Sequence, residues 1–225
     1  MALLVPLGAL VRLCKQRANK VGDPQLDDPE WKSMITEVVG ELHGITVENG
    51  ARYFETEATV DLGDLTLPED HLSTIGVDLV VDSAGRRRQL RPLRAQHRSG
   101  WVGQTGEAQR YALEGGSLAL YPVPSTGTYK HLYVPQPADL STAADQTTVD
   151  LITIWGRKFV VWGVASIAMH KGEDNQLRAI AERDAAREQV AFWAVQRKLH
   201  DASPRVVDDE DDGDGPCDPG DWRYR

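Results

Sequence analysis

The segment from Leu151 to Lys171, LITIWGRKFVVWGVASIAMHK, is the most apolar stretch of an otherwise polar and acidic chain. Its length is typical of a helix rather than a strand. Arg157 and Lys158 interrupt it, so no uncharged run reaches the roughly 18 residues that a membrane span requires. The segment therefore predicts a buried helix and no contact with a membrane.

The apolar side chains of this segment cover most of the helix circumference instead of one narrow stripe. A helix that is apolar nearly all round is buried on several sides. We therefore expect its large side chains to pack in a helical core or against another subunit. The residues expected to do so are Trp155, Phe159, Trp162 and Ile167, with Phe192 from the next helix.

Two helices are predicted before residue 50. The first covers about Leu7 to Lys20, and the second runs from Pro29 to about Glu48 with Asp28 as its N-cap. Gly40 and Gly44 lie four residues apart on the second helix. They indicate either a close crossing with another helix or glycines that are merely tolerated there.

A last helix, rich in Ala and charged residues, is predicted from Asn175 to about His200. It would complete a four-helix bundle with the two N-terminal helices and the apolar segment. Its inner side is expected to carry Leu177, Ala181, Ala185, Phe192 and Leu199.

Between residues 53 and 134 the spacing of the apolar residues changes to two, which is typical of strands. Glu114-Gly115-Gly116 indicates a hairpin between strands at 110–113 and 117–121. The predicted fold class is α+β, mainly α: a four-helix bundle with a small antiparallel β insert and an extended C-terminal tail. The predicted parts are the N-terminal helices (1–50), the β insert (51–135), the C-terminal helices (136–202) and the acidic tail (203–225).

The net charge of −9 is concentrated in the tail. Residues 206–225 hold eight acids and two Arg, which leaves a net charge of only −3 for residues 1–205. An acidic chain argues against non-specific nucleic-acid binding. Trp and Tyr beside Arg are typical interface anchors, so the tail is either a docking arm or a solvated terminus. The tail residues considered for docking are Asp208, Asp209, Glu210, Asp211, Asp212, Trp222, Arg223, Tyr224 and Arg225.

One basic cluster contrasts with this acidic background. It consists of Arg86, Arg87, Arg88, Arg91, Arg94 and Arg98. Such a cluster either contacts phosphates or the acidic surface of a neighbouring subunit or tail protein, or forms a solvated hairpin end and helix face. No aromatic residues alternate with these Arg residues, which argues against a platform for single-stranded nucleic acid.

Motifs that carry chemistry are missing from the sequence. The six His residues form no metal-binding pair, and there is no phosphate-binding glycine loop or nucleophile elbow. We predict no catalytic residue, no cofactor and no metal site, and hence no enzyme. The two cysteines, Cys14 and Cys217, lie near opposite ends and favour a reducing compartment over a disulfide.

Several local strings, in their order along the chain, resemble the head-to-tail adaptor (connector or neck) proteins of tailed bacteriophages, which sit under the portal. The resemblance covers about residues 1–200. It rests on VPLGALVRLCKQRANKVGDP (5–24), DPEWKSMITEVVGELHG (28–44), LPEDHLSTIGVDLVVDSAGRRRQLRPL (67–93), RYALEGGSLALYPVPSTGTY (110–129), KGED (171–174) and ERDAAR (182–187).

This resemblance implies a structural protein of the virion neck, assembled in the host cytoplasm. It implies a homo-oligomeric ring of twelve copies around the DNA channel, with the helices packed side by side. The portal protein and a tail, nozzle or further adaptor protein are the implied partners, and the C-terminal extension is expected to dock on the portal. DNA would pass without sequence-specific binding. The alternative is a nucleic-acid-associated factor that uses the Arg86–Arg98 cluster.

Overall fold

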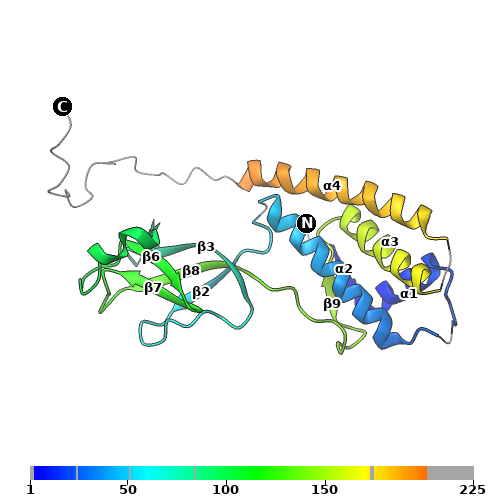
Figure 1. Cartoon of the computed structure of the whole chain (residues 1–225), viewed down its shortest axis with the longest axis horizontal. Coiled ribbons are helices and arrows are strands. Elements are labelled where there is room, and N and C mark those ends of the chain that lie inside the picture. Colours follow the sequence, from blue (N-terminus) through cyan, green and yellow to red (C-terminus); the bar gives the residue numbers. More distant parts are fainter. Residues whose placement is uncertain (1–2, 24, 51, 84, 173–174, 202–225) are drawn as a thin grey trace.

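The computed structural model describes residues 3–201, apart from 24, 51, 84, 173 and 174. Helices form one half of an elongated molecule and most strands form the other half (Figure 1). The predicted tail from 203 to 225 lies outside the described residues. The helices are α1 (Leu7–Arg17), α2 (Asp28–Glu48), α3 (Ile154–Lys171) and α4 (Leu177–Asp201), with a short 3-10 helix, η1 (Ala95–Gly100).

The starts of α2 and α3 are set by side-chain caps. Asp27 Oδ1 accepts a hydrogen bond of 2.9 Å from the Glu30 backbone N–H, so the cap of α2 is one residue earlier than the sequence suggested. Thr153 Oγ1 accepts from the Gly156 N–H at 3.1 Å and caps α3. Ile152 has a positive φ of 63° in the turn before this cap. The helix therefore begins at Ile154 instead of Leu151.

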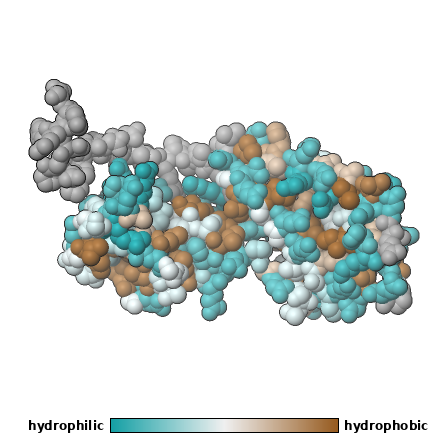
Figure 2. Space-filling view, in the orientation of Figure 1, coloured by the Kyte–Doolittle hydropathy of each residue, from teal (hydrophilic) through white to brown (hydrophobic). Residues whose placement is uncertain are grey.

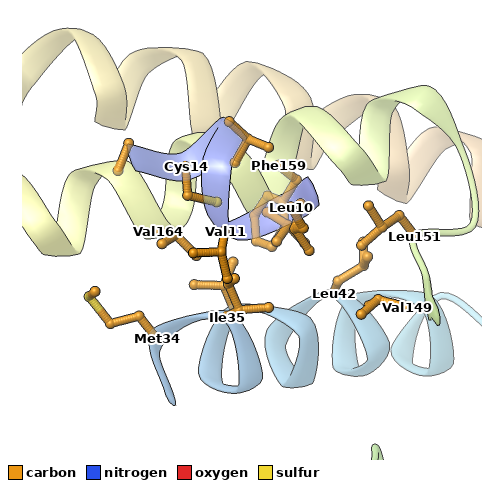
Figure 3. Packing of buried hydrophobic residues seen from close by; sticks show 14 of the residues in the cluster. Leu10, Val11, Cys14, Met34, Ile35, Leu42, Val149, Leu151, Phe159 and Val164 are labelled. Carbon is orange, nitrogen blue, oxygen red and sulfur yellow. The ribbon is translucent and has the colours of Figure 1, made fainter. Parts of the chain in front are cut away.

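The apolar segment forms the centre of the helical half, because α3 packs against α1, α2 and α4. Side chains from α1, α2 and α3 meet there with Val149 and Leu151 from the segment before α3 (Figure 3). Fully buried members of this core include Leu10, Cys14, Ile35, Phe159 and Val164. Burial raises the pKa of the Cys14 thiol to about 12, so this cysteine is an inert core residue.

The strands belong to three sheets. Their bounds are β1 (Leu4–Pro6), β2 (Thr56–Val60), β3 (His71–Val80), β4 (Arg87–Gln89), β5 (Arg91–Pro92), β6 (Arg110–Glu114), β7 (Ser117–Tyr121), β8 (Thr128–Pro135) and β9 (Thr148–Asp150). The β half contains an antiparallel sheet in the order β2-β8-β3-β4 and a three-stranded sheet in the order β5-β6-β7. The strands β1 and β9 pair antiparallel beside the helices, with Val5 opposite Val149.

The β half has an apolar core of its own. It is built by Val77 and Leu79 of β3, Leu118 and Leu120 of β7, and Tyr129 of β8, together with Leu90 and Ala108. The phenol of Tyr129 accepts a hydrogen bond of 3.1 Å from the Ala108 N–H, so its polar group is satisfied although the side chain is buried.

The prediction of a mainly α four-helix bundle is wrong. About 41% of the described residues are helical and 26% lie in strands, which form three sheets. The β half is also not purely antiparallel, because β5 pairs parallel to β6. The strands β1, β4, β5 and β9 have only two or three residues each, too few for a periodic pattern. They form because β1 pairs with the distant β9, β5 pairs with β6, and β4 pairs with β3 across the turn between them. The strand content is therefore higher than the sequence pattern indicated.

The predicted inner side of α4 is wrong as well. Ala179, Ala186, Val190 and Ala194 face the core, whereas Ala181 and Ala185 are exposed. Leu177 is 73% exposed and Phe192 is 62% exposed. The helix is therefore rotated by about half a turn relative to the prediction, and the side chain of Leu199 lies outside the described part of the structure.

No helix of the described part is long and apolar enough to cross a membrane.

Candidate functional site

The Arg86–Arg98 cluster lies in the β half, on the turn after β3, on β4 and β5, and on η1. Four of its six guanidinium groups pair with carboxylates of the same chain. Arg86 pairs with Asp82, Arg87 with Glu57 and Arg88 with Glu107, while Arg98 Nε lies 3.1 Å from Glu114 Oε1. Most of the positive charge that the sequence suggested for a partner is thus neutralised within the chain.

Hydrogen bonds in and beside these ion pairs shift the pKa values of the groups that take part in them. The hydrogen bond from Arg87 lowers the pKa of Glu57, and Lys130 also lies near that carboxylate, at 3.3 Å. The hydroxyl of Tyr121 donates to Glu114 Oε1 at 2.6 Å, which raises the pKa of Tyr121. Arg91 and Arg94 are exposed and have no acidic partner among residues 3–201 as described. These two remain the candidates for contact with another protein.

A groove of about 420 Å³ lies between α1 and α3 in the helical half. We call it the α1–α3 groove; it is lined by Leu13, Gln16, Arg17, Arg157, Lys158, Val161 and Trp162. The guanidinium of Arg17 lies 4.8 Å from the centroid of the Trp162 ring. The ammonium of Lys158 lies 4.7 Å from the Trp155 ring. These cation–π contacts hold aromatic and basic groups together at the surface.

A second apolar surface runs along α4. We call it the α4 outer face; it consists of Leu177, Ala181, Ala185, Glu188, Phe192 and Val195. Apolar side chains reach the molecular surface along the edge where α4 lies (Figure 2). Their three- and four-residue spacing places them on one stripe, opposite the buried residues of the helix.

The five large side chains predicted for core or subunit packing divide into three groups. Phe159 is fully buried in the helical core, and Trp162 and Ile167 pack against that core while remaining partly exposed. Trp155 and Phe192 are exposed. The structure thus brings Phe159, Trp162 and Ile167 together and leaves Trp155 and Phe192 at the surface.

A polar network lies inside the β half. Thr74 Oγ1 is 2.9 Å from His71 Nε2 and 2.9 Å from His131 Nε2, and the two imidazoles stack. His131 is buried, and Tyr133 stacks on its ring. Burial, and secondarily the charge of His71, lowers the pKa of His131 from 6.5 to about 4. His131 is therefore neutral in the folded protein at neutral pH.

This network predicts a loss of stability in mild acid. The folded state binds the His131 proton less well than the unfolded state, so stability is full above pH 6.5 and falls as the pH decreases toward 4. Compared with His131→Gln, the wild type should lose roughly 1–2 kcal/mol more between pH 7 and pH 5. Urea unfolding at several pH values measures this. Parallel curves for both proteins would contradict a neutral buried His131.

Among the described residues, no group of three or more His, Cys, Asp or Glu side chains is placed to hold a metal ion. The candidate surfaces present exposed aromatic and aliphatic side chains flanked by charges. The α1–α3 groove could not be predicted from the sequence, because Leu13, Arg17 and Trp162 are far apart in the chain. The sequence feature that could have indicated this groove is the charged pair Arg157-Lys158 within the most apolar segment.

The family model for the SU10 adaptor protein matches residues 8–212 of the chain. The chain belongs to the SU10 adaptor protein family. This adaptor is accordingly a phage head-to-tail adaptor protein, as the sequence resemblance indicated. The matched region spans α1 to α4 and all sheets of the β half, and thus contains the α1–α3 groove, the α4 outer face and the Arg cluster.

As a member of this family, the protein is a component of the virion and interacts with portal and tail proteins of the phage. Family membership is consistent with a structural role rather than an enzymatic one. No curated protein matches the sequence significantly.

Proposed function

We propose that this adaptor joins the portal to the tail as a ring of twelve copies around the DNA channel. The observation that carries the proposal is the family match over residues 8–212. The ring accounts for the two exposed apolar surfaces of the helical half, because single chains rarely leave such surfaces open without a partner. The protein acts by binding and not by catalysis.

The β half and the tail are proposed to bind the neighbouring components. Arg91 and Arg94, which are exposed and lack acidic partners in the described part, contact an acidic surface of the tail-side protein or of a neighbouring subunit. The C-terminal residues, from Asp208–Asp212 to Trp222–Arg225, dock on the portal; they lie outside the described residues. Acidic side chains on the channel wall would let DNA pass without binding, because fixed like charge disfavours contacts with phosphate.

Removal of residues 206–225 tests the docking tail. Deletion takes away six net negative charges and the aromatic terminus but no described part of the fold. We expect the truncated protein to keep its unfolding transition and to lose at least tenfold in affinity for the portal protein of the same phage. Co-sedimentation with purified portal measures the affinity.

A matched control for this deletion replaces the tail by a Gly/Ser segment of equal length. If both altered proteins bind the portal fully, the tail is not part of the portal interface, and the proposed adaptor function still holds. Failure of the full-length protein to bind portal at all would contradict the adaptor function itself.

The nucleic-acid alternative has less support. Four of the six cluster Arg residues already pair with carboxylates, and paired groups release fewer counterions from a phosphate backbone. Salt-dependent DNA binding by the isolated protein, lost on changing Arg91 and Arg94 to Ser, would be required to favour it.

A further inference from the structure

The helical half exposes two surfaces of different character. The α4 outer face is convex and mostly apolar, with Phe192 62% exposed and Val195 41% exposed near its C-terminal end. The α1–α3 groove is concave and is walled by Leu13 and the partly exposed ring of Trp162. A ridge and a groove of similar apolar composition can bury each other's side chains.

The two surfaces differ in charge. Arg17, Arg157 and Lys158 line the groove, and in the described part of the chain none of them pairs with a carboxylate. Glu188 lies within the α4 outer face, and Arg178 and Glu182 lie beside it; neither acid has a basic partner among the described residues. Within α4, Glu188 lies one turn from Phe192. The same turn therefore presents an unpaired acid and a large aromatic anchor.

Both surfaces belong to one rigid packing unit, because α3 packs against α1 as well as against α4. Neither surface can cover the other in the same chain, since the groove opens between α1 and α3 while the α4 outer face points away from the core. A contact between two different surfaces of identical chains is heterologous, and it generates a ring when the rotation closes.

We propose that the α4 outer face of one copy packs into the α1–α3 groove of the next copy. Phe192 enters the apolar part of the groove beside Leu13 and Trp162, and Glu188 pairs with Arg157 and Lys158 at its rim. The occupant is a second copy of this chain because the charges on the two surfaces are complementary. The inference rests on the proposed function, since it specifies the contact by which the ring closes.

Charge exchange tests the pairing in the full-length protein bound to the portal of the same phage. Glu188→Arg and Arg157→Glu should each reduce the fraction of multi-copy assembly in native mass measurements at least tenfold, because each brings like charges together. The double variant should recover assembly to within about threefold of the wild type, as expected for groups in contact. Glu41→Arg, at an exposed position of α2, is the matched control and should assemble normally.

Cross-linking gives a second readout that does not depend on affinity. In a Cys217→Ser background, Glu188→Cys combined with Arg157→Cys should yield a ladder of covalent oligomers with a short bis-maleimide. Glu41→Cys with Arg157→Cys should yield none. Cys14 does not interfere because it is buried.

The outcomes separate the pairing from the function. A wild-type ring that is insensitive to the charge changes and gives no ladder would overturn the pairing and leave the proposed function. Absence of any multi-copy assembly of the wild type on its portal would overturn both.

Discussion

Gly156→Ala is expected to lower the free energy of unfolding by about 3 kcal/mol or more. A Cβ at this position would overlap the backbone carbonyl oxygen of Leu151 and would lie 3.3 Å from Leu42 Cδ2. The carbonyl cannot easily move, because the Leu151 N–H donates to Leu3 O at 3.0 Å and ties the turn to the residue before β1. The substitution therefore distorts the start of α3, the central helix of the helical half.

Gly44→Ala is the matched control. A Cβ at Gly44, within α2, would meet no atom within 4 Å. Because Ala is the better helix former, this change should raise the free energy of unfolding by about 0.5–1 kcal/mol. Urea unfolding followed by circular dichroism measures both variants. Equal effects of the two substitutions would mean that Gly156 does not pack against the Leu151 carbonyl as described above.

Phe159→Ala should destabilise the folded chain by about 3–5 kcal/mol, because Phe159 is 1% exposed and its removal leaves a cavity among α1, α2 and α3. Phe192→Ala, on the same kind of side chain, should change the free energy of unfolding by less than about 0.5 kcal/mol, since Phe192 is mostly exposed. The sequence grouped the two residues together, and the structure assigns them different surroundings.

The comparison of these two Phe variants needs an assembly measurement beside the unfolding curves. The Phe192→Ala protein should fold normally and still assemble less well on the portal. The Phe159→Ala protein should assemble poorly because its folded state is destabilised. A large loss of stability for Phe192→Ala, or none for Phe159→Ala, would contradict the packing of the helical half.

The first three helices were predictable because α1 has a strong apolar period and α2 and α3 have side-chain caps. The structure has α2 at Asp28–Glu48, against a prediction of 29 to about 48, and the hairpin of β6 and β7 surrounds Gly115-Gly116 as expected. The rotation of α4 was not predictable in the same way. Ala faces the core at Ala179 and Ala186 and faces outward at Ala181 and Ala185, so small side chains do not distinguish its two sides.

The sequence also did not show which glycines lie at a close helix crossing. A Cβ at Gly40 would have only Pro137 Cγ within reach, at 4.0 Å, and Gly44 faces open space, so both are tolerated glycines. The close helix crossing involves Gly163 of α3, where a Cβ would lie 2.7 Å from Val38 Cγ1. Sequence spacing shows that glycines share a helix face, but it does not show which face meets another helix.

The candidate surfaces were only partly visible in the sequence. The density of Arg residues from 86 to 98 was evident, but their partners Glu57, Glu107 and Glu114 come from other strands and loops. The α1–α3 groove combines residues about 150 positions apart, which no local pattern connects. The tail predictions lie outside the described residues and stay predictions.

The central claim is that this adaptor forms a ring between portal and tail, and a cryo-electron microscopy reconstruction of the phage neck tests it most directly. We expect a ring of twelve copies between portal and tail, about 300 kDa from chains of 24.9 kDa, with the helical halves of neighbouring copies in contact. Single copies, or a location away from the portal, would contradict the account.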